Sequence, residues 1–315
     1  MKRIHFCAGL EEWNGMAVVA RLLAREQGAP LMDVADANSE TISGADEIWV
    51  HSCWSPAVWR ACRLALKARK TLVRMTHGNL DSVRLGYHGW RKHLAGPVER
   101  HCLRKASRIV ATCEAEKGWI EAYLGKRCPP IEVTDIKRFF KFGFNNPQLI
   151  TQNSQLHLLY LGRRHPLKGL QFLESASGEC ENVKVWKYGS VEIPNEDKWG
   201  IVFRVESGVL GEEKEKVWEW CDVLVLPTLS ENFGLVIAEA LERGKRVITT
   251  DGAPAWEDSL ELRVRSLESG GEIWSGFDGR MIYLKGYRDG AGEARVRLLK
   301  AALEMLHPGA PAASM

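Results

Sequence analysis

The residues best suited to chemistry lie at positions 223–240, where an apolar run is followed by a polar loop and a helical pattern. Glu231 stands just before the expected helix, and Glu239 lies inside it. The first backbone N–H groups of a helix are unpaired and its dipole is positive there, so a diphosphate fits at this end. The carboxylates could bind hydroxyl groups of a sugar and a ribose, and Gly234 would let a ligand approach the backbone. The same pattern also fits a capped helix with one solvated acid.

A second candidate segment, residues 160–170, has an apolar strand pattern that ends at a glycine and is followed by cations. Gly162 marks the turn, and Arg163 and Lys168 stand five positions apart. In a reaction that expels a nucleoside diphosphate, such cations would stabilise the charge that grows on the leaving group. Taken alone, the segment also fits a solvated basic loop.

Both segments need a scaffold, and the rest of the chain predicts one. Short apolar runs alternate with amphipathic helical stretches, which is typical of an α/β fold with a parallel, doubly wound sheet. Such sheets bind ligands at the carboxyl ends of their strands. The expected strands are residues 4–7, 47–51, 71–75, 108–112, 156–161, 183–188, 201–205, 223–226 and 246–249, and the expected helices are residues 15–26, 56–68, 114–124, 212–220, 233–243 and 293–306.

The alternation is interrupted at residues 126–155, which are rich in proline, glycine, asparagine and glutamine. Placing the connection near residues 145–155 predicts two domains, 1–150 and 151–306, facing each other across a cleft. The last helix could also pack back on the N-terminal domain. Residues 307–315 are expected to form a flexible tail.

The composition is that of an ordinary globular protein, with 315 residues, 45% hydrophobic residues and a formal net charge of +3. This charge does not indicate nucleic-acid binding. The eight cysteines are scattered, without C-x-x-C or metal-ligand spacing, which predicts free thiols in a reducing compartment. The N-terminus is basic, but its apolar run is too short for a signal peptide, and no apolar run in the chain is long enough to span a membrane. A cytoplasmic protein is therefore expected.

Together, the two candidate segments resemble the GT-B-fold retaining glycosyltransferases of family 4. Members carry a G-R-x4-K-G element and, later, an E-x7-E element, and this chain has both at residues 162–169 and 231–239. The continuation to residue 248 is also similar, although Arg246 replaces a usual proline. In the N-terminal half, Met75-Thr76-His77-Gly78-Asn79-Leu80-Asp81 resembles the P-H-G-M-L-D segment of members that build cell-surface polysaccharides. The pair Asn14-Gly15 stands where the family has a glycine loop, with Asn14 in place of one glycine.

The resemblance implies a GT-B fold with two Rossmann-like domains and a role for each matching residue. Arg163 and Lys168 would bind the donor diphosphate and Glu239 the nucleotide ribose. Glu231 and the backbone of residues 232–235 would contact the donor sugar and phosphate. His77 would lie beside the sugar near the reacting carbon, and His165 could line the site. The predicted donor-binding residues are Asn14, Gly15, Gly162, Arg163, Lys168, Glu231, Asn232, Phe233, Gly234, Leu235 and Glu239, and the predicted catalytic residues are His77, Arg163, Lys168 and Glu231.

The implied reaction transfers a sugar from a nucleoside diphosphate to an acceptor hydroxyl with retention of the anomeric configuration. The leaving phosphate takes the acceptor's proton, so no protein nucleophile is required. The chain contains no D-x-D triplet, and neither a metal nor another cofactor is expected. The favoured donor is a UDP-sugar, and the expected acceptor is a glycan or glycolipid in lipopolysaccharide or other surface-glycan biosynthesis.

Three other functions are alternatives to a glycosyltransferase. A sugar-nucleotide 2-epimerase has the same fold and would release free epimerised sugar without an acceptor. A non-catalytic nucleotide-sugar-binding protein is disfavoured by the intact Arg163, Lys168, Glu231 and Glu239. A Rossmann dehydrogenase is disfavoured because residues 9–15 do not form G-x-G-x-x-G.

Basic and aromatic residues are concentrated between positions 84 and 105 of the expected acceptor domain. Such a face could contact anionic lipid, which would make the protein peripheral on the inner membrane. The same residues also fit a solvated helix face with core aromatics. The residues concerned are Arg84, His88, Trp90, Arg91, Lys92, His93, Arg100, Arg104 and Lys105.

Overall fold

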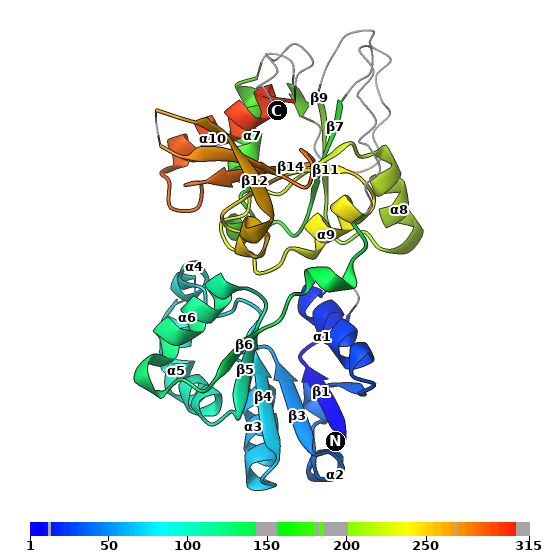
Figure 1. The fold of residues 1–315 in the computed structure, drawn as a ribbon, viewed down its shortest axis with the longest axis vertical. Helices are drawn as coiled ribbons and strands as arrows, with labels where there is room; N and C mark the ends of the chain where they lie inside the picture. The colour runs from blue at the N-terminus through cyan, green and yellow to red at the C-terminus, as the bar shows by residue number, and fades with distance from the viewer. Residues whose placement is uncertain are drawn as a thin grey trace. The chain divides into compact units, whose positions relative to one another are not determined.

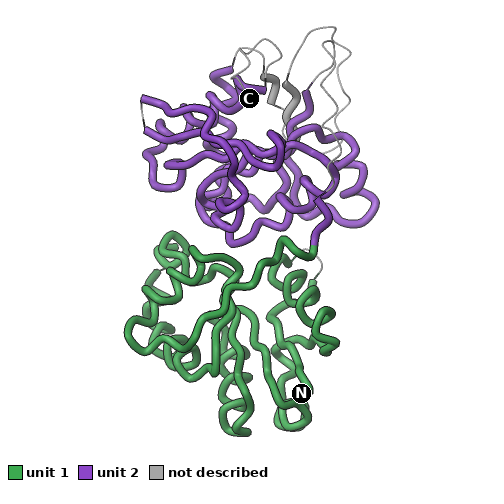
Figure 2. Tube along the Cα trace, in the orientation of Figure 1, with its two compact units in different colours: residues 1–139 green, residues 140–315 purple. Residues whose placement is uncertain are grey.

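The computed structural model describes residues 1–11, 14–87, 89–142, 156–180, 183–185, 201–268 and 270–306. The chain divides into two compact units, unit 1 (Met1–Phe139) and unit 2 (Phe140–Met315), coloured separately in Figure 2. Each unit has its own sheet with helices packed on it (Figure 1), so the predicted α/β fold with two Rossmann-like domains is confirmed. The division lies before the predicted boundary at residue 150, and the predicted connection at residues 145–155 and the tail 307–315 fall outside the described residues.

Unit 1 is built on a six-stranded parallel sheet with the order β2-β1-β3-β4-β5-β6. Its central strands are buried almost completely, as in any parallel sheet that is covered on both faces. This explains why they read as continuous apolar runs in the sequence. The strands are β1 (Arg3–Cys7), β2 (Leu31–Asp33), β3 (Glu47–His51), β4 (Thr71–Met75), β5 (Arg108–Ala111) and β6 (Ile131–Val133).

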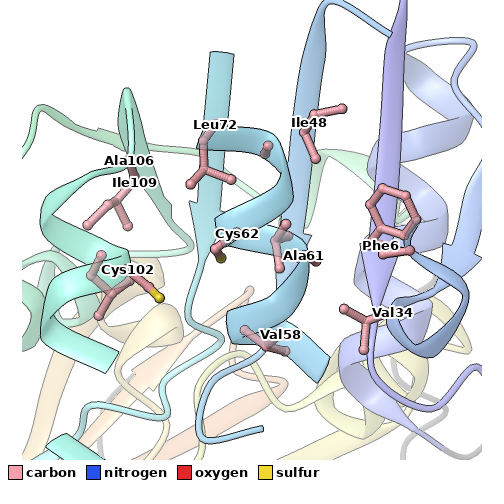
Figure 3. Close-up of a cluster of buried hydrophobic side chains, with 14 of the residues drawn as sticks. Phe6, Val34, Ile48, Val58, Ala61, Cys62, Leu72, Cys102, Ala106 and Ile109 are labelled. Carbon is pink, nitrogen blue, oxygen red and sulfur yellow. The ribbon is translucent and has the colours of Figure 1, made fainter. Parts of the chain in front are cut away.

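The helices of unit 1 begin where the sequence supplies suitable residues. Asn14 caps the first helix with its side chain, and Pro56 occupies the first turn of another, where its missing N–H is no loss. Figure 3 shows Cys62 and Ala61 of α3 packed among strand residues such as Leu72 and Ile48, with Cys102 of α5 beside them. The helices are α1 (Gly15–Glu26), α2 (Ser39–Ser43), α3 (Pro56–Lys67), α4 (Ser82–Gly86), α5 (Gly89–Arg104) and α6 (Glu114–Leu124), with 3-10 turns η1 (Val34–Asp36), η2 (Gly125–Arg127) and η3 (Lys137–Phe139).

Unit 2 contains an eight-stranded sheet with the order β12-β13-β14-β11-β10-β7-β9-β8. The strands from β14 to β8 pair in parallel, which confirms the doubly wound pattern expected from the sequence. The carboxyl ends of β7, β10 and β11 therefore meet at one edge. The strands are β7 (Leu156–Leu161), β8 (Val183–Val185), β9 (Ile201–Glu206), β10 (Val223–Val225), β11 (Arg246–Thr250), β12 (Leu260–Ser266), β13 (Glu272–Gly276) and β14 (Met281–Lys285).

The sequence analysis did not predict β12, β13 and β14, which extend this sheet beyond β11. β13 pairs antiparallel with both β12 and β14. β12 is mostly exposed, and its apolar residues alternate with charged ones, which is the period-2 pattern of a strand that the sequence analysis did not use. Its strand conformation follows from pairing with β13, which is a tertiary effect.

Along the chain, each helix of unit 2 connects two parallel strands, except for the last helix, which follows β14. The sequence left open a last helix packed on the N-terminal domain. In the structure α10 packs chiefly against α7, and the buried residues of α10 include Leu298, Leu299 and Leu303, so its apolar face belongs to the core of unit 2. The helices are α7 (Leu170–Gly178), α8 (Gly211–Trp220), α9 (Leu235–Glu242) and α10 (Gly292–Glu304), with 3-10 turns η4 (Pro166–Lys168) and η5 (Pro254–Ser259).

Two further features of the described chain bear on the predictions. All eight cysteines are free, and five of them are buried. No helix among the described residues is both long and apolar enough to cross a bilayer.

Candidate functional site

Three loops of unit 2 come together at the carboxyl ends of β7, β10 and β11. The carbonyl oxygen of Leu167, after β7, accepts hydrogen bonds from Leu229 N (2.8 Å) and Thr228 Oγ1 (3.1 Å), after β10. The backbone N–H of Glu231 donates to Gly252 O, after β11, at 2.7 Å. Segments about eighty residues apart in sequence thus form one hydrogen-bonded edge, as expected for the ligand-binding edge of a doubly wound sheet.

Two glycines allow these loops to approach one another. A Cβ added at Gly169 would lie 1.8 Å from Pro227 O, and one added at Gly252 would lie 2.0 Å from Thr228 O. Gly169 also has φ +70°, in the left-handed region that side chains disfavour. The close contact with the loop after β10 therefore explains why the second glycine of the G-R-x4-K-G segment, Gly169, has no side chain.

Lys168 and Glu231 form an ion pair that joins the two segments singled out in the sequence. Their side chains are only 15% and 17% exposed. The carboxylate localises the ammonium group, and Glu231 Oε1 also accepts from the N–H of Asn232 at 3.3 Å. The structure thus places a cation and a carboxylate next to each other, both partly accessible, at the start of α9.

The start of α9 has the free donors that an anion site requires. Gly234 precedes the helix with φ +70°, Leu235 is the first helical residue, and no described side chain caps this end. Phe233 has a different role from the others. Its ring is buried against Trp256, and its carbonyl accepts from Trp256 Nε1, so its side chain anchors the loop from behind.

The remaining residues of the first loop differ in accessibility. Arg163 is exposed, and its carbonyl oxygen accepts from the buried Tyr160 hydroxyl at 3.0 Å, which fixes the backbone beside Gly162. His165 uses Nδ1 to accept from Leu167 N at 3.2 Å and thereby starts the 3-10 turn η4. Its observed contact is structural, while the Arg163 guanidinium is in a position to meet solvent anions.

Glu239, the predicted ribose ligand, has a partner that the sequence analysis missed. Lys214 of α8 places its Nζ 2.8 Å from Glu239 Oε1 and 2.7 Å from Oε2. Both side chains are about a quarter exposed (23% and 24%), so a ligand can still reach the pair. Nothing in the composition of α8 distinguishes Lys214 from its neighbour Lys216, and only the packing of α8 beside α9 selects it.

In unit 1, His77 follows β4 in a strained, buried turn. Its φ is +52° and its side chain is 5% exposed. A non-glycine residue in this region costs about 1–3 kcal/mol and is typical of functional sites. Burial lowers the pKa of His77 to about 4, against a smaller opposing effect of Glu116. The ring is therefore neutral at pH 7.

Glu116 holds the turn around His77 in place. One carboxylate oxygen accepts from Gly78 N (2.6 Å) and Thr76 Oγ1 (2.7 Å), and the other accepts from the N–H and hydroxyl of Thr112, both at 2.8 Å. Glu116 is completely buried and ties the end of β4 to the end of β5. The sequence analysis did not single out Glu116, and the signal for its role is an acid in the first turn of α6.

Asn14 and Gly15 are found at the start of α1, as predicted, but Asn14 is occupied. Its Oδ1 accepts from Met16 N at 3.1 Å, and its Nδ2 donates to Ala8 O (3.1 Å) and Gly9 O (2.7 Å). The amide thus closes the loop after β1 and caps the helix. Gly15 is exposed at the first helical position and offers the better contact for a ligand.

Comparison with known proteins agrees with this arrangement. Residues 155–263 match the family model described as "Glycosyl transferases group 1", and residues 37–135 match the one described as "Glycosyltransferase Family 4". The first match contains both loops with Lys168 and Glu231, and the second contains His77 and Glu116. No curated protein matches the chain.

Solved structures share the fold at low sequence identity. Sucrose-phosphate synthase from Thermosynechococcus elongatus superimposes with a TM-score of 0.61 at 14% identity, covering 96% of this chain and 90% of that one. Anabaena HepE in complex with UDP gives 0.59 at 15% identity, with 100% and 93% covered. Trehalose 6-phosphate synthase from Burkholderia multivorans gives 0.54 at 10%, with 97% and 91% covered. With both family models matched and the GT-B architecture present, this chain belongs to the group 1 glycosyltransferases of the GT-B fold.

Proposed function

We propose that the protein transfers a sugar from a nucleoside diphosphate, with UDP favoured, to an acceptor hydroxyl with retention of configuration. The observation that carries the proposal is the Lys168–Glu231 pair, which joins the loops after β7 and β10 at the uncapped start of α9. This edge offers a cation, helical N–H groups and a carboxylate to a ligand with a diphosphate and hydroxyls. UDP is favoured because the similar structure of Anabaena HepE is described with UDP and with UDP-glucose.

In the proposed reaction the protein stabilises the departing diphosphate. Arg163 and Lys168 bind its oxygens, and the first N–H groups of α9 add donors that do not need to reorganise. One such donor is worth about 3–4 kcal/mol of transition-state stabilisation. Glu239 binds the ribose, with Lys214 holding the carboxylate in place, and Glu231 contacts the donor sugar. The leaving phosphate accepts the acceptor's proton, so no protein nucleophile is needed.

Metal independence is part of this proposal. It is supported by the absence of a D-x-D triplet from the sequence and by the cations at the carboxyl ends of the strands. Within the described parts of the chain, no group of three histidine, cysteine, aspartate or glutamate side chains is arranged to hold a metal ion. The basic side chains would do the work that a metal does on a diphosphate.

A donor screen tests the proposal. The protein is incubated with UDP-, GDP- and ADP-sugars, first in a thermal-shift assay and then with glycan and glycolipid acceptors in the presence of a chelator. We expect UDP-sugars to stabilise the protein and the product linkage to keep the donor's anomeric configuration. An inverted product, or complete loss of activity in the chelator, would contradict the mechanism. Free epimerised sugar formed without any acceptor would instead identify a 2-epimerase.

We also propose that the acceptor is a glycolipid of surface-glycan biosynthesis and that α5 contacts anionic lipid. Trp90, Leu94 and Val98 are 64%, 71% and 43% exposed and recur every four residues, so they share one face of the helix. The exposed Arg91 stacks its guanidinium on Trp90. An apolar stripe with cations beside it suits the boundary between lipid tails and anionic headgroups.

The structure narrows the set of residues predicted for this contact. Arg100 lies over the Tyr123 ring and donates to Tyr123 O, and Lys92 donates to the carbonyl oxygen of Arg84, so these basic groups serve the fold. His88 is outside the described residues. Arg104 likewise donates to Leu124 O, so the exposed basic residues that remain are Arg91, His93 and Lys105.

Flotation with anionic vesicles tests the lipid contact. The variant W90S/L94S should lower the bound fraction at least about tenfold, because each buried apolar side chain contributes roughly 1.5–3 kcal/mol. The control is L262S, since Leu262 is likewise exposed (48%) but lies on β12 of unit 2. Equal binding of all three proteins would remove the proposed lipid contact while leaving the donor site untouched.

A further inference from the structure

Three buried histidines form a continuous chain across the sheet of unit 1. His51 Nδ1 lies 2.9 Å from His77 Nε2, and His51 Nε2 lies 3.0 Å from His5 Nδ1. His5 Nε2 lies 3.3 Å from Oε1 of Gln27, the residue that ends α1. His5 lies in β1, His51 lies in the neighbouring strand β3, and His77 lies in the turn after the next strand, β4; their exposed fractions are 0%, 0% and 5%.

The chain has a direction because its outer end is fixed. The Gln27 Oε1 atom can only accept, so His5 must carry its proton on Nε2. A neutral imidazole then has a lone pair at Nδ1, which requires His51 to donate from Nε2. By the same rule His51 accepts at Nδ1, and His77 donates from Nε2. The remaining ring nitrogen of His77, Nδ1, is therefore left as an acceptor.

This order of protons requires neutral imidazole rings, and the surroundings keep the rings neutral. Burial lowers the pKa of His5 to about 4, although the hydrogen bond to Gln27 and the charge of Glu47 favour the protonated form, and Arg3 acts in the same direction as burial. Burial also lowers the pKa of His51 well below its usual value, with Arg74 acting in the same direction.

His77 meets the same conditions. Burial lowers its pKa to about 4 although Glu116 favours the charged form, and Arg84 opposes Glu116. All three histidines therefore carry one proton each at neutral pH, and the position of each proton is set by the neighbouring ring.

We propose that Gln27, His5 and His51 are positioning residues that hold His77 in the Nε2–H tautomer, so that Nδ1 accepts a hydrogen bond from a hydroxyl of the donor sugar. The inference rests on the proposed function and on the place beside the donor sugar that the family resemblance implies for His77. The Glu116 clamp fixes the backbone on either side of His77, and the histidine chain fixes the proton on its ring. The hydroxyl then meets an acceptor that does not have to change tautomer during binding.

Gln27 is the best position for a test because it is only half-buried and lies at the opposite end of the histidine chain from His77. Q27E keeps an acceptor and should preserve the tautomer. Q27K offers only donors, which reverses every hydrogen bond and should place the His77 proton on Nδ1. Q27M removes the polar group and should give a mixture of the two tautomers.

The tautomers are read by nitrogen-15 NMR on protein with labelled histidines, with His77 assigned by H77Q. Kinetics are measured with a UDP-sugar and an acceptor, and UDP binding is measured separately. We expect Nε2–H for His77 in the parent and in Q27E. Q27K should show Nδ1–H and about a tenfold loss in kcat/KM, the effect of one hydrogen bond, with the Kd for UDP unchanged.

Two results would overturn the inference alone: an Nδ1–H tautomer in the parent protein, or Q27K with the parent's kcat/KM while the parent binds UDP and transfers sugar. If the parent neither binds a nucleotide nor transfers a sugar, the proposed function is wrong and the catalytic meaning of the histidine chain falls with it. A change in UDP affinity in Q27K would show that Gln27 acts on the nucleotide and would likewise contradict the inference.

Discussion

Glu231 contacts residues of two other loops. Its carboxylate pairs with Lys168, and its backbone N–H donates to Gly252. About one sixth of each side chain is exposed to solvent. The pair therefore loses less hydration than a deeply buried ion pair does, and it can open to admit a ligand without a large free-energy penalty. Each side chain of the pair thus keeps the other in position before a ligand binds.

Removing either member of this pair should abolish transfer and leave the fold intact. In K168A the leaving diphosphate loses a charged donor, and in E231A the donor sugar loses its carboxylate partner, each lowering kcat by at least about a hundredfold. The measurement is single-turnover transfer, with circular dichroism to confirm folding. K216A and E213A, on the exposed face of α8, are the matched controls. Turnover at the parent's rate in K168A and E231A would show that the site is wrongly assigned.

The buried histidines predict how stability depends on pH. His5 and His77 have pKa values lowered to about 4 in the folded protein, whereas unfolded histidine titrates near 6.5. Below pH 6.5 the unfolded chain binds protons that the folded protein does not, so stability is full above 6.5 and falls towards pH 4. Each ring contributes up to about 3 kcal/mol at the acid end.

Urea unfolding between pH 4 and pH 8 measures this slope. H5Q and H77Q should each reduce the slope of the free energy of unfolding against pH by the contribution of one proton, about 1.4 kcal/mol per pH unit. H101Q, at an exposed position of α5, is the control and should leave the slope unchanged. A slope in H5Q equal to that of the parent would mean that His5 does not stay neutral in the folded protein.

At the level of elements, the loops of unit 2 depend on glycines more than on any side chain. The contacts from Gly169 to Pro227 and from Gly252 to Thr228 leave no room for a Cβ. The sequence contains a glycine at both positions, but it cannot show which backbone lies opposite. The neighbouring elements were predicted well: α1, α6 and β7 have the expected bounds, because periodicity and capping residues are local signals.

Alanine at these glycines should destabilise unit 2. G169A adds a clash with backbone to a left-handed φ, and G252A adds the clash alone, which costs about 1–3 kcal/mol, with somewhat more for G169A. G178A, in α7, meets nothing within 4 Å and should be neutral or slightly stabilising. Thermal unfolding monitored by calorimetry separates the three. An unchanged midpoint for G169A would contradict the close approach of the two loops.

At the level of the whole molecule, the chain has two cores that are built from different halves of the sequence. The main hydrophobic cluster of unit 1 is formed by residues between Ile4 and Ile131, and the sheet of unit 2 begins at Leu156. The proposed machinery is divided accordingly. The leaving-group residues are in unit 2, while His77, its histidine chain and the exposed stripe of α5 are in unit 1.

A lesion in one core should therefore leave the other protected. Hydrogen exchange of G169A, followed by mass spectrometry, should accelerate in peptides that contain β7 and β10. Peptides that contain β3 and β4 should keep the parent's rate, because none of their hydrogen-bond partners has changed. Equal acceleration in both sets of peptides would mean that the two cores unfold as a single cooperative unit.

The sequence by itself determined the α/β class with two parallel-sheet domains and most of the parallel strands, and it singled out the two segments that the Lys168–Glu231 pair joins. These follow from hydrophobic periodicity and from residue types at fixed spacing, which are local properties of the chain. The tertiary structure decided which residues face one another: Lys214 beside Glu239, Glu116 beneath the turn of His77, the histidine chain from Gln27, and the antiparallel strands β12 to β14. These contacts join positions that are far apart in sequence, and a pattern in one chain carries no signal for a partner that only folding brings near.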